Sequence, residues 1–402
     1  MGCSASKPSE PSNAKLPSAP VPKKVEQVPE PKPEPQPQPE PQPQPEPPKP
    51  AEPAPAPAPA PEPQKPAEPA PKVVAVEDDT NEAYGLLLCG AGESGKTTFT
   101  RQLKLRYLNG FNEKDCRDFL RTIRGNLVET MQLLLVWLEH NNIEIEDSEL
   151  SSMAQDIIDV DPQDCEFNEE LVEKLKALWE NEQIKKAFEH KDETAVPDHM
   201  PYFFAKIDEL AGEDYIPSNE DVLRARIRSI GIEAITFDLQ GARIRIFDVG
   251  GQKSERSKWA NVMNQVEGVI FCVSFAEFDK PMFEDQNVLR INDSLEIFGN
   301  ITHQEKFSNS PIFLVCNKFD VFTEKIKNTD AFVKIFPEFS GDSHNPEACA
   351  DYLIQRFLDK AAPLSEDRPI IQYKIVALNG DQVVETADAI CKFISDKYYQ
   401  DA

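Results

Sequence analysis

The stretch Leu86-Leu87-Leu88-Cys89-Gly90-Ala91-Gly92-Glu93-Ser94-Gly95-Lys96-Thr97 decides which fold we expect for this chain. Its second part matches the phosphate-loop pattern G-x-x-x-x-G-K-[ST], and the apolar run before it reads as a buried strand leading into a helix. Glycines let backbone N–H groups turn around a polyphosphate, and the helix N-terminus adds a favourable dipole. Lys96 is expected to reach the outer phosphates and Thr97 to bind Mg²⁺. A glycine-rich turn without a ligand is the alternative, but the strand and helix on either side favour a nucleoside triphosphate.

A second motif follows an alternating strand at residues 242–247. It reads Asp-Val-Gly-Gly-Gln over residues 248–252. At the end of that strand, Asp248 would face the magnesium shell and Gly251 the terminal phosphate. Gln252 would then stand where it can orient an attacking water.

A third motif, Asn-Lys-Phe-Asp at residues 317–320, follows the apolar strand 312–317. The Asp320 carboxylate can accept two hydrogen bonds from the edge of guanine, a donor pair that adenine lacks. A P-loop ATPase is therefore disfavoured. Each short motif is weak alone, but three in order at strand ends predict a guanine nucleotide site.

A fourth segment reduces the number of candidate families of guanine nucleotide-binding proteins. It lies at residues 221–231 and reads Asp-Val-Leu-Arg-Ala-Arg-Ile-Arg-Ser-Ile-Gly. With the phosphate loop, the run DVGGQKSERSKW at 248–259 and the NKFD motif, these residues resemble heterotrimeric G-protein alpha subunits, in which these four motifs occur in this order. The resemblance extends from about residue 84 to about residue 394. Small monomeric GTPases lack the long insertion found here between Leu108 and Asp221.

The resemblance implies an α/β fold class: a Ras-like P-loop GTPase domain with a six-stranded, mostly parallel sheet, an inserted all-helical domain and a disordered Pro-rich N-terminal tail. We expect the tail at 1–80, the Ras-like domain at 81–113 and 219–402, and the helical domain at 114–218. Strands are expected near 84–89, 233–239, 242–247, 268–274, 312–317 and 371–377. Apolar spacings of three and four predict helices at about 119–138, 148–158, 169–188 and 202–210, with Trp137 and Trp179 as core residues.

The resemblance also implies roles for individual residues. Arg226 would be the catalytic arginine supplied in cis, and Gln252 would orient the water. Thr97 and Ser229 would give their hydroxyls to Mg²⁺, although the family usually has Thr at the second position. The other expected nucleotide contacts are Gly90, Glu93, Ser94, Gly95, Lys96, Thr98, Leu223, Arg224, Asp248, Gly250, Gly251, Asn317, Lys318, Asp320 and Ala377.

The resemblance further implies two ion pairs, and one loop of the site differs from the family's sequence. Glu93 would pair with Arg226 in the GDP state, and Arg256 would pair with Asp293 in the GTP state. The family's T-C-A-T loop is represented only by Ile-Val-Ala-Leu at 375–378, so Ala377 is the one residue carried over to the guanine pocket.

The N-terminal segment has a different character, since most of the 36 prolines precede Val73. Such a segment cannot bury a core and favours polyproline II, either as a ligand for proline-binding domains or as a passive spacer. Gly2 and Cys3 fit a myristoylation site beside a palmitoylation site. Two acyl chains would hold the protein at the inner leaflet, on the cytoplasmic face of a cell membrane.

Charge and cysteine content exclude other classes. A net charge of −27 argues against nucleic acid and against attraction to anionic lipid, so attachment would depend on the acyl chains. The eight cysteines show no C-x-x-C pair. We read Cys89, Cys272 and Cys316 as reduced core residues.

The sequence therefore predicts a guanine nucleotide-binding signal transducer that slowly hydrolyses GTP to GDP and switches the binding of an effector protein. Beta-gamma and a seven-helix receptor are further partners of the family. The proline tract, which leaves only residues 72–82 for a short N-terminal helix, argues against beta-gamma. The polar residues 397–402 argue against the receptor. The alternative is a GTP- or GDP-dependent scaffold with negligible hydrolysis that recruits partners through the tail, and it does not explain Gln252 and Arg226.

Overall fold

The structure, a computed structural model, describes residues 83–191, 194, 196–197, 199–227, 229, 231–282, 284–361 and 368–399. The predicted tail with Gly2 and Cys3 lies outside these residues, and so does the expected helix remnant at 72–82. Among the described helices, none is both long and apolar enough to cross a bilayer.

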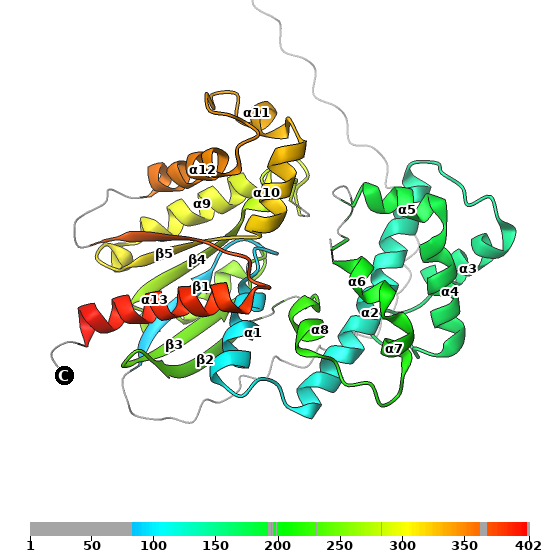
Figure 1. The fold of residues 1–402 in the computed structure, drawn as a ribbon, viewed down its shortest axis with the longest axis horizontal. Coiled ribbons are helices and arrows are strands. Elements are labelled where there is room, and N and C mark those ends of the chain that lie inside the picture. Colours follow the sequence, from blue (N-terminus) through cyan, green and yellow to red (C-terminus); the bar gives the residue numbers. More distant parts are fainter. Residues whose placement is uncertain are drawn as a thin grey trace, which may run out of the picture. The chain divides into compact units, whose positions relative to one another are not determined.

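The centre of the fold is a six-stranded sheet in the order β2-β3-β1-β4-β5-β6 (Figure 1). Its strands are β1 (Tyr84–Cys89), β2 (Ile232–Leu239), β3 (Ala242–Val249), β4 (Gly268–Ser274), β5 (Ile312–Asn317) and β6 (Ile370–Lys374). Strand β2 runs antiparallel to β3, and all other neighbours are parallel. The predicted mostly parallel sheet is confirmed.

The last strand is shorter than the predicted range 371–377, which was wrong at its C-terminal end. Strand β6 ends at Lys374. The Ile375 N–H still donates to Cys316 O, at 2.9 Å, but the chain then turns, and the Asn379 N–H donates to Val376 O at 2.8 Å. The turn takes Ala377 out of the sheet and toward the end of β5.

Helices cover both faces of the sheet because β1 alternates its buried side chains. Leu86 and Leu88 belong to the core under one face, and Leu87 and Cys89 to the core under the other. The first face carries α1 (Lys96–Tyr107) and α13 (Gly380–Tyr398). The second carries α9 (Arg290–Thr302), α10 (Phe319–Asn328), α11 (Ala331–Ile335) and α12 (Pro346–Lys360) (Figure 1).

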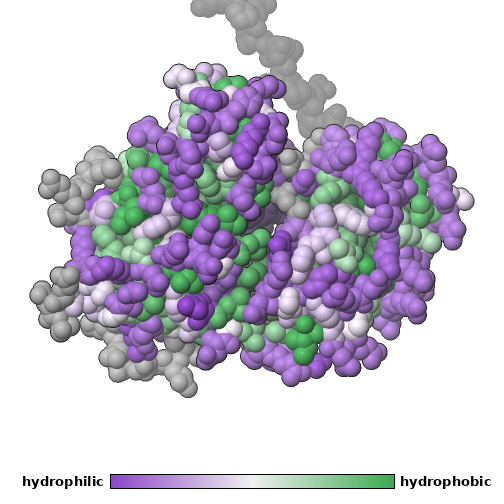
Figure 2. Space-filling view, in the orientation of Figure 1, coloured by the Kyte–Doolittle hydropathy of each residue, from purple (hydrophilic) through white to green (hydrophobic). Residues whose placement is uncertain are grey.

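A separate hydrophobic core joins six helices, which we call the helical lobe. They are α2 (Glu113–His140), α3 (Ser148–Ile158), α4 (Glu169–Glu180), α5 (Glu182–Glu189), α6 (Met200–Ala205) and α7 (Ile207–Ala211). The predicted long helix is α2, which begins with a capping box between Asn112 and Asp115. Trp137 and Trp179 both pack in this core, as predicted. Hydrophilic residues cover most of the lobe's surface in Figure 2.

Two predicted helices of this lobe are each divided in two. The predicted helix 169–188 breaks at Asn181, which is extended and whose side chain accepts from the first N–H groups of α5. The predicted helix 202–210 breaks at Lys206, which ends α6 and precedes α7. Apolar periodicity continues through both breaks, so it predicted the buried face but not the interruption.

Short elements connect these parts. Helix α8 (Asn219–Arg224) begins with a capping box between Ser218 and Asp221. The 3₁₀ turns are η1 (Arg256–Asn261), η2 (Met263–Gln265), η3 (Phe275–Glu277) and η4 (Glu305–Phe307). Cys89, Cys272 and Cys316 are buried free thiols, as predicted.

Candidate functional site

A cavity of about 690 Å³ lies at the carboxyl ends of β1, β3 and β5. This edge is where open parallel sheets bind ligands, and the volume lies within the range of about 300–1,000 Å³ that small-molecule sites occupy. The lining comes from the phosphate loop, the segment after α8, the ends of β3 and β5, and the loop after β6. Residues of the segment between α5 and α6 of the helical lobe, including Lys191 and His199, complete it.

Backbone geometry shapes the phosphate loop. Gly90 and Gly95 have φ values of 138° and 100°, and Glu93 has φ 62°. Lys96 is buried, and its Nζ donates to Gly90 O at 3.2 Å and to Ala91 O at 2.7 Å. Burial lowers the pKa of Lys96, and the nearby Asp248 opposes this change. The loop therefore holds its lysine folded against its own carbonyls.

The second motif packs tightly on this loop. A Cβ at Gly251 would lie 2.4 Å from Lys96 Nζ and 2.5 Å from Gly90 O, so only glycine permits this approach. Gly92 lies close to Gln252, with 3.5 Å from its ideal Cβ position to Gln252 Cγ. Gln252 therefore lies beside the phosphate loop.

Most of the residues predicted for the site meet in this cavity. Its lining includes Glu93, Gly95, Lys96, Thr97, Thr98, Leu223, Arg224, Arg226, Ser229, Gly251, Gln252, Asn317, Lys318, Asp320 and Ala377. Gly90, Ser94, Asp248 and Gly250 do not line it but lie behind the lining. Ser94 and Asp248 are buried, and Gly250 O accepts a hydrogen bond from Trp259 Nε1 at 2.8 Å.

Three oxygens suited to a hard cation lie at the start of α1. Thr97 Oγ1 and Ser229 Oγ are 2.5 Å apart. Asp248 Oδ1 is buried and has no hydrogen-bond partner among the described residues, while Oδ2 accepts from Thr100 at 3.2 Å. Burial raises the pKa of Asp248 to about 6. An orphaned carboxylate oxygen near paired hydroxyls is the donor chemistry that Mg²⁺ takes, together with water and phosphate oxygens.

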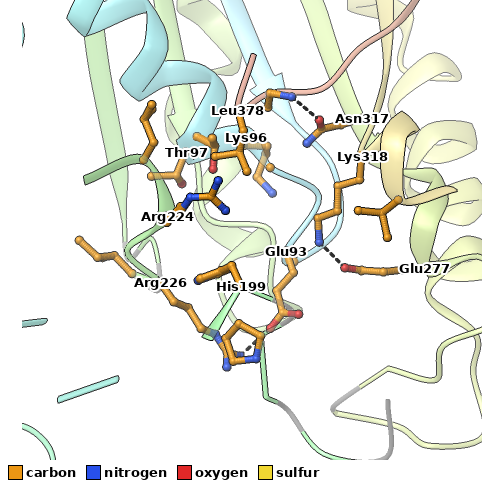
Figure 3. Close-up of a pocket in the computed structure, with 18 of the residues that line it drawn as sticks. Glu93, Lys96, Thr97, His199, Arg224, Arg226, Glu277, Asn317, Lys318 and Leu378 are labelled. Carbon is orange, nitrogen blue, oxygen red and sulfur yellow. Dashed lines mark hydrogen bonds and ion pairs between the residues drawn. The ribbon is translucent and has the colours of Figure 1, made fainter. Parts of the chain in front are cut away.

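The other end of the cavity is organised by Asn317 (Figure 3). Its Nδ2 donates to Ser94 O at 2.9 Å, and its Oδ1 accepts from the Ala377 N–H at 2.8 Å. One side chain thus joins the phosphate loop, the end of β5 and the loop after β6. Gln102 on α1 also holds the loop after β6, because its Nε2 donates to Ala377 O and Leu378 O at 3.1 Å each.

Comparison with known proteins identifies the family to which this geometry belongs. The sequence profile of the G-protein alpha subunit matches residues 64–394, which is most of the chain. The chain belongs to the G-protein alpha subunit family. A guanine nucleotide-binding protein alpha-2 subunit of Dictyostelium discoideum is 36% identical over 284 residues, which are 68% of this chain and 78% of that protein. A G(o) subunit alpha of Planorbella trivolvis is 32% identical over 312 residues, 77% of this chain and 87% of that protein.

As an alpha subunit, the protein is a guanine nucleotide-binding signal transducer. The scaffold alternative is not favoured. In this alpha subunit Glu93 and Arg226 form an ion pair, with 2.6 Å from Glu93 Oε1 to the guanidinium, while its predicted restriction to the GDP state stays a prediction.

That ion pair is one end of a chain of alternating charges that the sequence did not predict. Arg290 contacts Glu93 at 2.6 Å and Glu277 at 3.0 Å, and Lys318 also contacts Glu277. Burial alone would raise the pKa of Glu277, but Lys318 and Arg290 outweigh it and lower the pKa to about 2. Neither Arg290 nor Glu277 lies in a motif, and no local pattern distinguishes them from surface charges.

The cavity is positively charged although the whole chain is acidic. Its described lining holds eight Lys and Arg residues, namely Lys96, Arg101, Lys191, Arg224, Arg226, Lys280, Arg290 and Lys318. It holds three acidic ones, Glu93, Glu277 and Asp320. The net charge of the chain is −27, so this excess of positive charge is local, and it favours the binding of a polyphosphate.

Proposed function

We propose that this alpha subunit hydrolyses GTP to GDP slowly, with Mg²⁺ as its cofactor, and thereby switches the binding of an effector protein at the cytoplasmic face of a membrane. One observation carries the proposal: a single positively charged cavity is lined by the phosphate loop, Gln252, Arg226 and the guanine motif. A protein that only bound the nucleotide would not need the glutamine and the arginine.

The residues would act by position and charge. Attack of water on the γ-phosphate needs little covalent help, but the water must be held and the developing charge stabilised. Gln252 would hold the water through its side-chain amide, since it stands beside the phosphate loop. Arg226 would leave Glu93 and turn its guanidinium to the phosphate, where it would stabilise negative charge.

Thr97, Ser229 and Asp248 would hold Mg²⁺. Their paired hydroxyls and orphaned carboxylate oxygen fit an octahedral oxygen shell that keeps some waters. When bound, Mg²⁺ would neutralise charge on the β- and γ-phosphate oxygens.

We also propose the domain limits 81–113 with 219–402 for the Ras-like domain and 114–218 for the helical domain. The hydrophobic core shared by α2–α7 supports the limits 114–218 of the helical domain. Lys191 and His199 line the cavity, so the helical lobe would cover the nucleotide and slow its release. Acylation of Gly2 and Cys3 would supply the membrane anchor, and the effector would bind the segment that includes η1. The proline tract argues against beta-gamma as a partner and the polar residues 397–402 argue against a seven-helix receptor, so this alpha subunit would work without them.

Single-turnover hydrolysis of Mg-GTP by the full chain tests the proposal. We expect Gln252→Leu and Arg226→Cys each to slow hydrolysis by more than about tenfold, the effect of ~1.4 kcal/mol on the barrier. Arg245→Cys is the matched control, because Arg245 lies on β3 and donates to Thr236 Oγ1 at 3.2 Å, away from the cavity. Excess ATP should not compete. Tight GTP binding without turnover in the unmodified chain would favour the scaffold instead.

A further inference from the structure

The backbone that carries Arg226 is held by two side chains outside its own segment. Helix α8 ends at Arg224, and Ala225 leaves it in an extended conformation, with φ −58° and ψ 123°. The last carbonyls of a helix have no partner within it, so Val222 O and its successors need donors from elsewhere. Helix α1 supplies the donor to Val222 O and Ala225 O, and α2 supplies the donor to Arg226 O, which lies past the end of α8 (Figure 1).

Arg101 on α1 provides the first anchor. One guanidinium nitrogen, NH1, donates to Val222 O and to Ala225 O, each at 2.7 Å. The side chain is 5% exposed, and burial lowers its pKa to about 10, which leaves it charged at neutral pH. A positive charge at a helix C-terminus is also favourable. Since α1 begins at the phosphate loop, Arg101 fixes the end of α8 relative to that loop.

Asn126 on α2 provides the second anchor, and it acts on Arg226 itself. Its Nδ2 donates to Arg226 O at 3.1 Å, and the residue is 9% exposed. Asn126 is not part of the cavity lining, so it does not reach the nucleotide. Its neighbours on α2 are core residues of the helical lobe, including Ile123 and Leu127.

We propose that Asn126 and Arg101 are positioning residues for hydrolysis: they fix the backbone of Arg226 so that its guanidinium can reach the γ-phosphate. The inference rests on the catalytic role proposed for Arg226. It makes the rate of hydrolysis depend on the helical lobe, because the anchor on Arg226 itself comes from α2. When that hydrogen bond is lost, Arg226 keeps its charge, but its guanidinium is no longer oriented toward the γ-phosphate.

The test compares Asn126→Ala with Gln132→Ala in single-turnover hydrolysis of Mg-GTP. Gln132 is a matched control, because it lies on the same helix and its amide also donates to backbone carbonyls, those of Ile157, Ile158 and Val160. We expect Asn126→Ala to slow hydrolysis about tenfold, with GTP and GDP dissociation changed less than about twofold. Gln132→Ala should leave hydrolysis unchanged. Equal slowing by both variants would show general loosening of the lobe and overturn the proposal.

A double-mutant cycle distinguishes positioning from a merely structural role. If Asn126 acts through Arg226, Asn126→Ala should not slow hydrolysis further when Arg226 is already replaced by Cys. A further tenfold decrease in the rate of hydrolysis in the double variant would overturn the proposal. If Arg226→Cys alone hydrolysed GTP normally, the proposed function would fail. If only Arg226→Cys were slow, the inference about Asn126 would fail alone.

Arg101→Lys gives a second arm that preserves charge. A lysine ammonium lies one bond nearer its own backbone than NH1 does, so it would not reach both carbonyls at 2.7 Å and hydrolysis should again slow. Arg101 is part of the cavity lining, and the lysine keeps the positive charge there. Thermal unfolding of each GDP-bound variant confirms that it is folded. A folded Arg101→Lys protein with normal hydrolysis would overturn the role assigned to Arg101.

Discussion

The Arg256 guanidinium donates two hydrogen bonds to the Asp293 carboxylate, at 2.9 and 2.6 Å. Its Nε also donates to Gly251 O at 3.1 Å. One side chain therefore joins the backbone beside the phosphate loop to the first turn of α9. The sequence predicts this pair for the GTP state, but it is present together with the Glu93–Arg226 pair predicted for the GDP state, so the link of each pair to one nucleotide state stays a prediction. Asp293 is 4% exposed, so this carboxylate depends on Arg256 for compensation.

Breaking this pair should loosen η1 without removing any trypsin site. We expect Asp293→Asn, with a non-hydrolysable GTP analogue bound, to be cut by trypsin within residues 252–259 faster than the unmodified chain. Asp285→Asn is the control, since Asp285 Oδ1 accepts from the N–H and the side-chain Nδ2 of the nearby Asn287, at 3.1 and 3.4 Å. Equal protection of all three proteins would show that the pair does not order this segment.

The guanine end of the cavity should depend on Gln102. Gln102→Leu would remove two hydrogen bonds to the loop after β6, each worth about 1 kcal/mol, and leave both carbonyls without this donor. We expect a fluorescent GDP analogue to dissociate about tenfold faster from this variant. Gln355→Leu, on the exposed side of α12, should not change the rate. An unaltered rate in Gln102→Leu would mean that the loop holds its position without α1.

The start of α8 should be sensitive to acid. Asp221 is fully buried and accepts from Tyr202 at 2.7 Å, Tyr215 at 2.6 Å and Lys206 at 2.9 Å. Burial alone would raise its pKa, but these donors, Tyr215 foremost, lower it from 3.8 to about 2. A lowered folded-state pKa gives stability that is present above pH 4 and is lost as the pH falls toward 2.

Urea unfolding of Asp221→Asn and of the unmodified chain, each measured at several pH values, tests this. The variant should be less stable at pH 7, and the difference in unfolding free energy should shrink as the pH falls from 4 toward 2. A difference that stays constant over that range would contradict the assignment, because protonation of Asp221 would then have no effect.

Membrane attachment should need both acylation sites, which lie outside the described residues. One acyl chain binds a bilayer only marginally, so Cys3→Ser should leave a reversible fraction on membranes and Gly2→Ala almost none. Fractionation of cells expressing each variant, with labelled fatty acids, measures this. Full membrane recovery of Gly2→Ala would point to a different anchor.

The sequence by itself determined the local parts of this protein. The run at 86–97 specifies a strand, a loop and a helix because its apolar residues, glycines and lysine act within a few positions of one another. The order of the three motifs then placed Gln252 and Asp320 at strand ends, and parallel strands bring such ends to one edge of a sheet. Helix α3 has the bounds predicted from its apolar spacing, since that spacing indicates the buried face of a helix.

Only the tertiary structure decided which distant side chains hold these parts in place. Gln102 meets Ala377 across 275 positions and Glu93 meets Arg290 across 197, and no periodicity extends that far. The same holds for Asn126, whose partner is a backbone carbonyl that carries no sequence signal. Hydrogen bonds and ion pairs depend on atoms meeting within about 3 Å, a condition that only the packed chain defines.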